Sequence, residues 1–458
     1  MPSNIALVHS PQYPKLWNKT LGSLTDEQEA LHGDKSVLVV PWQSVTLSYR
    51  QLAQRSRVLA KAMLEMGLHH GDCVGIITGN CYQYIEGFLR ELRNAVIASS
   101  CKLGFFSPAI GSRSLGPNLT LPELRRMVLL ASDAVGGEHV GSQEYGTFTS
   151  NAHSVFMNDS VLKQMEQWLS VDDVLNLQNL INNAHFVGDT MKLTPDDIIC
   201  CPPPLFHCSG LVMGFLASSC YGGSLIFPSD YFNAKIAVDC MVQENATVIL
   251  GVPTMYIAKM EVAAQTGHRS HRLRTGIVSG STISLSLVKQ VQQCMGVGKT
   301  PLTCITGLED SDEKRATTVG RVMPHTTAKV INTNENTLRR GERGELCASG
   351  PSQTREVMKR DENGILERSA GSTGVVEVFL NPAVQGGTQV LGILGSLNLS
   401  PREHRDVSRH TIIGTIRQQP GATTAVVLRI QFYDARAAVI AVDLRNREAG
   451  ASSCFFIL

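Results

Sequence analysis

The sequence predicts an α/β protein whose core is a mainly parallel β-sheet with helical crossovers. Between residues 172 and 349, short apolar runs are typical of buried strands at Ile198–Cys201, Ser224–Phe227 and Thr247–Gly251. A helical pattern at Ala234–Glu244 separates the last two runs, as a crossover between parallel strands requires. The 458 residues, of which 43% are hydrophobic, suffice for two or more units with such a core.

The N-terminal part of the chain has the same α/β character. Tyr49–Met66 carries apolar residues at nearly helical spacing, and Gly67 follows in the usual position of a C-cap glycine. A turn then leads to Cys73–Thr78, a short buried strand, and Tyr82–Leu89 predicts a further helix. This order of helix, strand and helix fits the fold class inferred for the middle of the chain.

Two stretches differ from this α/β pattern in their composition and in the elements that they predict. Ser107–Asn151 is rich in glycine, serine and proline, so we expect loops there with one helix near Leu121–Leu130. The tail from about Ala370 predicts strands at Val375–Leu380 and Ala425–Phe432 without the alternating helices of the preceding region.

Composition excludes several classes of function. Lys and Arg number 41 and Asp and Glu 40, so no strong electric field favours nucleic acid or an anionic membrane as a partner. The 12 cysteines include no Cys-x-x-Cys pair, which indicates free thiols in a reducing compartment. The most apolar stretch, Leu211–Phe227, is interrupted by glycine and serine, and Met1–Thr20 lacks a secretory signal. We therefore expect a cytoplasmic protein without a membrane span.

Five strings and an opening segment, in the same order along the chain from Leu47 to Gly350, resemble one enzyme family. The five strings read CCPPPLFHCSG, ATVILGVPTMY, LRTGIVSGSTIS, TTVGRVMPHTTAKV and RGERGELCASG, at Cys200–Gly210, Ala246–Tyr256, Leu273–Ser284, Thr317–Val330 and Arg340–Gly350. Together with the opening segment LSYRQLAQRSRVLAKAMLEMG, they resemble the adenylate-forming, or AMP-binding, acyl-CoA ligases. Fungal acyl-CoA ligases of secondary metabolism look most similar.

The resemblance implies a fold and a chemistry. The fold is the layered N-terminal domain of the adenylate-forming enzymes, here incomplete, with an atypical C-terminal tail. Residues 1–171 and 172–369 would be the first part and the core of the AMP-binding domain, and residues 370–458 the tail. In the implied reaction a carboxylate attacks the α-phosphate of ATP, giving an acyl-adenylate and pyrophosphate, and the thiol of coenzyme A then displaces AMP, with Mg²⁺ assisting. The partners would be a small carboxylic acid and a nucleotide; the chain does not end in a peroxisomal Ser-Lys-Leu signal.

The resemblance also indicates candidate site residues. His207 matches the family histidine that borders the acyl pocket, so we expect a catalytic role; the alternative is a core histidine satisfied by backbone groups. Ser279, Gly280, Ser281 and Thr282 match the loop that receives adenine, although a strand-to-helix turn also requires a glycine there. A metal site at Cys201, His207 and Cys208 is not expected, since the spacing is wrong and a second ligand cluster is missing.

Several family motifs are missing from the chain. The glycine-rich phosphate loop should precede Asn179, but Gln178 joins directly to that residue. The Tyr-Gly-x-Thr-Glu motif should lie near Lys299, and a strand with its turn is missing at Leu89–Arg90. The ribose-binding segment, the hinge and the terminal catalytic lysine are likewise not recognisable. The chain can therefore be a working ligase of this family or a catalytically inactive remnant or mis-spliced product.

Two further strings imitate known sites. Gly296–Thr300 resembles the end of a Walker loop, but Gln293 replaces its first glycine and a helical pattern precedes it, so we do not expect a phosphate loop. An acidic cluster at Glu309, Asp310, Asp312 and Glu313 is expected to be a solvated loop and not a metal site, since adjacent acids cannot all face one ion.

Overall fold

A computed structural model describes the backbone of most of the chain. The described residues are 5–68, 73–89, 101–111, 113–114, 126–130, 142–152, 171–268, 271–278, 285–295, 304–305, 308–311, 320–332, 334, 336–342, 344–350, 356–360, 366–370, 412–418, 422–432, 438–445 and 452–456. The chain divides into two compact units, one formed by Gln12–Pro324 and the other by Met1–Pro11 with His325–Leu458.

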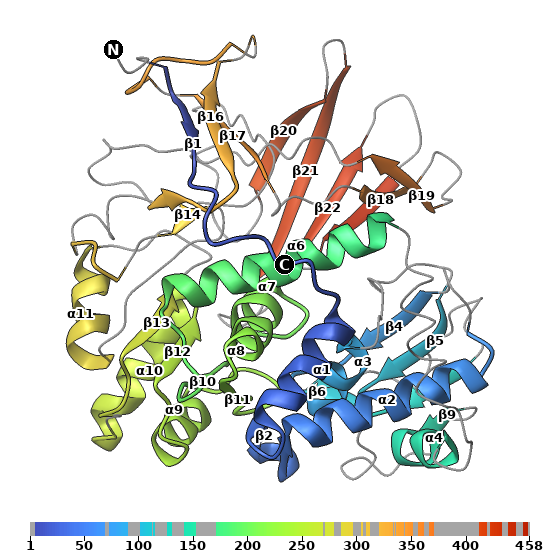
Figure 1. The fold of residues 1–458 in the computed structure, drawn as a ribbon. Coiled ribbons are helices and arrows are strands. Elements are labelled where there is room, and N and C mark those ends of the chain that lie inside the picture. The colour runs from blue at the N-terminus through green and yellow to red at the C-terminus, as the bar shows by residue number, and fades with distance from the viewer. Residues whose placement is uncertain are drawn as a thin grey trace. The chain divides into compact units, whose positions relative to one another are not determined.

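A six-stranded sheet forms the centre of the unit Gln12–Pro324, with the order β13-β12-β10-β11-β2-β3 (Figure 1). The first five strands run parallel, and β3 is antiparallel to β2. This confirms the predicted parallel sheet with helical crossovers. The strands are β2 (Ser36–Val40), β3 (Val45–Ser48), β10 (Ile198–Cys200), β11 (Ser224–Ile226), β12 (Val248–Gly251) and β13 (Thr275–Val278).

Both faces of this sheet are covered by helices, which explains why its strands are continuous apolar runs. Ile199, Leu225 and Leu250 belong to a core with α1 (Leu21–His32), α2 (Tyr49–Glu65), α3 (Tyr82–Leu89) and α6 (Val171–Thr190). Their chain neighbours Cys200, Ile226 and Ile249 belong to a second core with α9 (Ala234–Gln243), α10 (Pro253–Thr266) and α11 (Leu285–Met295). Successive residues of each strand thus alternate between two buried layers.

Local sequence signals begin and end the helices. Ser48 accepts a hydrogen bond from the amide of Gln51, whose side chain accepts from the amide of Ser48, and this capping box starts α2. Asn233 caps α9 in the same manner, through the amide of Ile236. At the end of α10, Gly267 adopts a left-handed conformation that its missing side chain permits.

A second parallel sheet has the order β4-β5-β8-β9. Its strands are β4 (Cys73–Ile77), β5 (Cys101–Phe106), β8 (Arg126–Leu129) and β9 (Ser142–Glu144), and α4 (Tyr145–Ala152) follows. Short pairs are formed by β6 (Ala109–Ile110) with β7 (Arg113–Ser114) and by β14 (Cys304–Ile305) with β15 (Arg321–Val322). A one-turn helix, η1 (Pro41–Gln43), connects β2 to β3.

The structure corrects the prediction for residues 107–151. Arg126–Leu129 is a strand, where we expected a helix. It pairs with β5 and β9, and Val128 and Leu130 are buried in the core that this sheet forms with α2 and α4. The stretch expected to be loop also contains β9 and α4; Tyr145 and Phe148 anchor that helix against Phe105. A helix or strand this short is decided by tertiary packing more than by local pattern.

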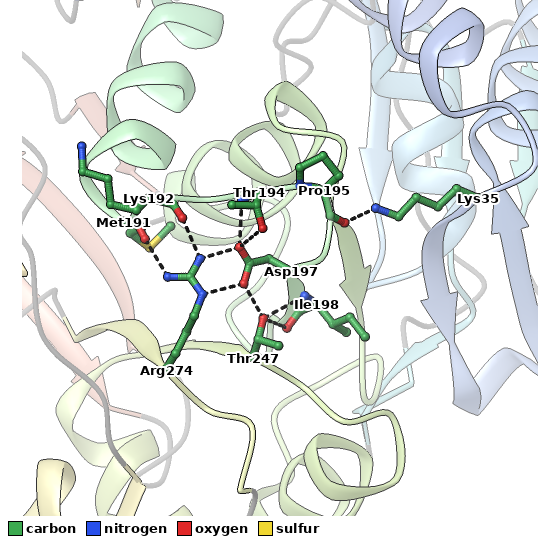
Figure 2. A network of polar contacts seen from close by, with 9 residues as sticks. All are labelled: Lys35, Met191, Lys192, Thr194, Pro195, Asp197, Ile198, Thr247 and Arg274. Carbon is green, nitrogen blue, oxygen red and sulfur yellow. Dashed lines mark hydrogen bonds and ion pairs between the residues drawn. The ribbon is translucent and has the colours of Figure 1, made fainter.

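An ion pair between the buried Asp197 and the partly exposed Arg274 joins the starts of three parallel strands (Figure 2). Arg274, just before β13, donates to both oxygens of Asp197, just before β10, and Thr247 donates to Asp197 at 2.7 Å. Arg274 also donates to the carbonyl oxygens of Met191 and Lys192, where α6 ends. The carboxylate and the guanidinium group thus satisfy each other's hydrogen bonds at the edge of the sheet opposite the candidate site.

The other unit is antiparallel. Strands β1 (Leu7–His9), β16 (Thr327–Ile331) and β17 (Glu345–Ser349) form one sheet, and β18 (Glu356–Arg360) pairs with β19 (Leu366–Ala370). Strands β20 (Ile412–Gln418), β21 (Ala422–Phe432), β22 (Ala438–Arg445) and β23 (Ser452–Phe456) form a meander. The strand expected at Ala425–Phe432 is confirmed, and Val375–Leu380 lies outside the described residues. Across the parts of the chain that are described, no helix is long and apolar enough to cross a membrane.

Candidate functional site

The chain makes a tight turn after β10 that presents His207. The amide of His207 donates to the carbonyl oxygen of Pro204 at 3.1 Å, and the amides of Gly210 and Leu211 both donate to the carbonyl oxygen of His207 at 3.0 Å. A side chain on Gly210 would place its Cβ 2.3 Å from the carbonyl oxygen of Pro204. Glycine is therefore required at this position, and the turn leads straight into the short helix α7 (Cys208–Gly210).

A π-helical segment, η2 (Leu211–Leu216), follows this turn and continues into α8 (Ala217–Cys220). A Cβ on Gly214 would lie 2.7 Å from Sγ of Cys201, so the missing side chain lets η2 pack directly on the end of β10. Single π-turns are rare and occur frequently beside functional sites. This geometry places a widened helical turn immediately beyond the candidate histidine.

His207 caps α7 with its own side chain. Its Nδ1 accepts from the amide of Ser209 at 3.1 Å and lies 2.8 Å from Oγ of that residue and 3.6 Å from Sγ of Cys208. Burial lowers the pKa of the imidazole below its ordinary value, since a charged ring is poorly solvated there. His207 is thus a partly buried, neutral group, with one ring nitrogen satisfied by the backbone, as the alternative interpretation requires.

Asn80 clamps the turn that carries His207. The side chain of Asn80, 123 residues earlier in the chain, donates to the carbonyl oxygen of Pro203 at 3.0 Å and accepts from the amide of Leu205 at 2.8 Å. The backbone of Asn80 is itself held, because its carbonyl oxygen accepts from the indole N–H of Trp42 at 3.1 Å. A buried amide with both ends paired fixes the position of the turn in the fold.

Asp230, beyond the end of β11, joins the same group of loops. Its carbonyl oxygen accepts from the amide of Asn80 at 2.8 Å, and its carboxylate accepts from the amide of Gly111 at 2.7 Å. A Cβ on Gly79 would lie 2.4 Å from that carbonyl oxygen, so the loop after β4 can approach only with glycine there. Loops that follow β4, β10 and β11 are therefore bound together at the carboxyl ends of parallel strands, where α/β proteins bind ligands.

A buried lysine supports the end of β12. Lys259 on α10 has no exposed surface and donates to the carbonyl oxygen of Leu250 at 3.2 Å. Its ammonium nitrogen lies 4.1 Å from the centre of the Tyr256 ring. Burial lowers the pKa of Lys259 to about 8, although Cys200 and Cys201 act in the opposite direction.

The structure tests the candidate residues unequally. Ser279, Gly280, Ser281 and Thr282 lie outside the described residues, which stop at Val278, the last residue of β13, so their role remains a prediction. The role of His207 also remains a prediction, with its surroundings now defined. Sequence reasoning missed a group of supporting residues, Asn80, Ser209 and Lys259. The only signal for the first was a Gly-Asn pair directly after a strand; the other two lie in ordinary helical patterns.

A continuous helix occupies the position of the missing phosphate loop. The 20 residues of α6 (Val171–Thr190) run without interruption through the join at Gln178–Asn179. Beyond the join, the side chain of Asn182 accepts from the amide of Trp17 at 2.7 Å and donates to its carbonyl oxygen at 3.0 Å. The helix is thus fixed against the N-terminal segment, and its backbone amides are used within the helix.

The acidic cluster is not arranged as a metal site where it is described. Asp310 accepts two hydrogen bonds from Arg321, each 2.8 Å long. Its carboxylate is buried, so the expectation of a solvated loop is wrong at this residue. Asp312 and Glu313 lie outside the described residues. Within the described ranges, no group of three or more His, Cys, Asp or Glu residues could hold a metal ion. The two described acids therefore give no support to a cation site.

Comparison with known proteins identifies relatives that align over most of their own length. The chain is 30% identical to "Acyl-CoA ligase SID4" from Ajellomyces capsulatus, over 93% of this chain and 84% of the relative. It is 31% identical to "Acyl-CoA ligase sidI" from Aspergillus fumigatus (94% and 84%) and 32% to "Acyl-CoA ligase cnsG" from Penicillium expansum (94% and 85%). The first alignment extends over 501 positions, more than the 458 residues of this chain. It therefore includes segments that the relative has and this chain lacks.

Solved structures share the fold at low sequence identity. An anthranilate CoA ligase in complex with anthranoyl-AMP superposes with a TM-score of 0.61 at 14% identity, over 77% of this chain and 78% of that one. A long-chain-fatty-acid-CoA ligase from Archaeoglobus fulgidus gives 0.60 at 15% identity, over 80% and 87%. The fold class expected from the sequence is confirmed. The sequence model of the family described as "AMP-binding enzyme" matches residues 25–100 and 174–358, and the chain belongs to this family.

Proposed function

We propose that the protein is an AMP-forming acyl-CoA ligase, which activates a carboxylic acid as its adenylate and passes the acyl group to coenzyme A in the biosynthesis of a secondary metabolite. The observation that carries this proposal is the similarity to three fungal acyl-CoA ligases over more than nine-tenths of the chain. The group of loops that Asn80 and Asp230 hold together around His207 would face the acid.

A catalytically inactive product of the same ancestry is the second candidate, and α6 favours it. ATP brings several negative charges to an incoming carboxylate, and the family shields them with Mg²⁺ and the amides of a glycine-rich loop. In this chain an uninterrupted helix, α6, lies where that loop would be, and its amides are hydrogen bonded within the helix. The buried carboxylate of Asp310 is paired with Arg321 and not with a cation. The described residues therefore do not fit ATP–Mg²⁺ as the family binds it.

Acid-dependent exchange of pyrophosphate into ATP separates the two candidates. The purified full-length chain would be assayed with a panel of acyl, aryl and hydroxy acids, beside a His207→Ala variant. Because losing a single charge-stabilising donor typically slows such reactions by about 10²–10³, the inactive product would give exchange close to the background of the variant. Exchange far above that background, with any acid of the panel, would establish the ligase and exclude the inactive product.

A second measurement tests binding without turnover. Isothermal titration with AMP and with a non-hydrolysable acyl-adenylate analogue reports whether the nucleotide site is intact in a chain that does not catalyse exchange. Binding of the analogue without exchange would define a non-catalytic nucleotide-binding member of the family. No binding of either compound would indicate that the chain has lost the whole ligand site.

A further inference from the structure

The imidazole of His207 faces a backbone N–H group with one of its two ring nitrogens. The amide of Ser209 donates to Nδ1 at 3.1 Å, and Oγ of Ser209 lies 2.8 Å from the same nitrogen. A backbone amide can only donate a hydrogen bond, so Nδ1 must offer a lone pair. The proton of the neutral imidazole consequently resides on Nε2.

Protonation of His207 would disrupt this arrangement. A proton added to Nδ1 would point at the amide proton of Ser209, and the cap of α7 would be lost. Burial acts in the same direction, since it lowers the pKa of the ring. Among the described residues, the titratable group in contact with the ring is the thiol of Cys208, whose own pKa burial raises, so neither group carries a charge near neutral pH.

We propose that Ser209 is a positioning residue, which holds His207 as a neutral imidazole and presents its Nε2–H as a fixed hydrogen-bond donor to a ligand oxygen. Within the described part of the chain, no residue is hydrogen bonded to Nε2. An N–H group held in this way suits an anionic oxygen and cannot act as a base. That this oxygen belongs to the carboxyl group of the acid rests on the proposed function; the tautomer and its cause do not.

Nitrogen NMR of the full-length protein, labelled with ¹⁵N-histidine, reads the tautomer directly. The signals of His207 are assigned by their loss in a His207→Gln variant. We expect a pyridine-type Nδ1 and a pyrrole-type Nε2, unchanged from pH 8 down to the ordinary pKa of histidine. A pyrrole-type Nδ1, or a ring that becomes charged at that ordinary pKa, would overturn the proposal.

The same spectrum contains an internal reference, His268, for which the opposite tautomer is expected. Nδ1 of the exposed His268 lies 3.1 Å from a carboxylate oxygen of Asp239, which can only accept, so its Nδ1 carries a proton. We expect His268 to show a pyrrole-type Nδ1 in the protein in which His207 shows a pyridine-type Nδ1. Identical patterns at both residues would mean that local hydrogen bonds do not select the tautomer of His207.

Ser209→Ala and Ser219→Ala form a matched pair of variants. Both remove a buried hydroxyl group from the same helical region, but Oγ of Ser219 has no hydrogen-bond partner among the described residues. Loss of the Ser209 hydroxyl should raise the pKa of His207 by about 0.5–1 pH unit, and Ser209→Thr should restore it. Ser219→Ala should change nothing. Equal effects of the two alanine variants on His207 would contradict a specific role for Ser209.

The result is independent of turnover. If Ser209→Ala does not fold, the tautomer of wild-type His207 still decides the proposal. If the chain shows the expected tautomer but no pyrophosphate exchange, the ligase is refuted and the role of Ser209 stands. If the chain is active but His207 has a pyrrole-type Nδ1, the role of Ser209 is refuted and the ligase stands.

Discussion

The ammonium nitrogen of Lys259 donates to the carbonyl oxygen of Leu250 at 3.2 Å from a position with no solvent-exposed surface. In the described residues no carboxylate forms an ion pair with it; the face of the Tyr256 ring, 4.1 Å away, is the other favourable contact. A buried cation without an anion is costly, and it relieves that cost by releasing its proton more readily.

Stability should therefore depend on pH through Lys259. Its pKa is about 8 in the folded protein against an ordinary 10.5, so the unfolded chain binds more protons between these values and stability rises with pH. Below pH 8 the burial cost is fully present, on the order of 3 kcal/mol. Lys259→Met should be most stabilising relative to wild type at pH 7, with that advantage shrinking towards pH 10 in urea unfolding followed by circular dichroism. Parallel curves for variant and wild type would refute this; Lys235→Met, at an exposed position, is the control.

The ion pair of Asp197 and Arg274 should be essential for stability. Burial alone would raise the pKa of Asp197, but hydrogen bonds from Arg274 and Thr247 outweigh it and keep the pKa below its ordinary 3.8. The contribution of Asp197 is thus present above that value and is lost as the pH falls through its folded pKa. Arg274→Met should cost about 1–3 kcal/mol in urea unfolding at pH 7, since it removes the charged partner of a buried carboxylate that keeps hydrogen bonds from Thr194 and Thr247. Arg50→Met, which breaks an exposed pair with Asp34, should have no measurable effect.

Insertion of a loop should be tolerated at Gly267 but not at Gln178. Ten Gly and Ser residues placed after Gln178 would divide α6 and leave new helix ends without caps. The same insertion after Gly267 extends an exposed turn whose glycine has no neighbouring atoms within 4 Å of a Cβ. We expect a lower midpoint of thermal unfolding and a smaller helical signal for the first variant alone. Equal midpoints would indicate that a loop can be accommodated between Gln178 and Asn179 without loss of stability.

Two glycine-to-alanine substitutions should act in opposite directions. A methyl group on Gly79 would lie 2.4 Å from the backbone oxygen of Asp230, so Gly79→Ala must push two loops apart and should cost about 1–3 kcal/mol. Gly146, on the exposed side of α4, has open space around it. Gly146→Ala should stabilise by about 0.5 kcal/mol through helix propensity. Both values follow from denaturant unfolding, and a neutral Gly79→Ala would show that the approach of the two loops is not tight.

Long, strongly patterned elements were predictable from the sequence. The helices Tyr49–Glu65 and Ala234–Gln243 agree with the expected ranges to within one or two residues, as do the three central strands β10, β11 and β12. In each case apolar periodicity, caps and burial favour the same structure, as with the capping box of Ser48 and Gln51. The other strands of that sheet, β2, β3 and β13, were not expected. The strand at Arg126–Leu129 was missed because its state depends on parallel partners at Leu103–Phe106 and Ser142–Glu144, which no local pattern reveals.

For the candidate site, the sequence indicated only the central residue, whose role stays a prediction. The resemblance pointed to His207, but its surroundings depend on distant pairings, such as the one between Asn80 and Leu205, that a local pattern does not encode. The role of Ser209 depends on which atom of its neighbour's ring faces it, a matter of side-chain geometry at a short helix. The three-part division at residues 171 and 369 likewise remains a prediction.

The strands of the central sheet come from two separate stretches of chain, 36–48 and 198–278. The residues between these two stretches, which include the second sheet, form one long connection between neighbouring strands of the central sheet. The entropic cost of closing such a connection grows only with the logarithm of its length. Removing tens of residues therefore changes this contribution to the folding free energy by less than about 1 kcal/mol. A gene that loses a part of this stretch outside the helices that pack on the sheet can consequently still encode a sheet of unchanged register. Loss of the chemistry and loss of the fold are therefore separate events in such a product.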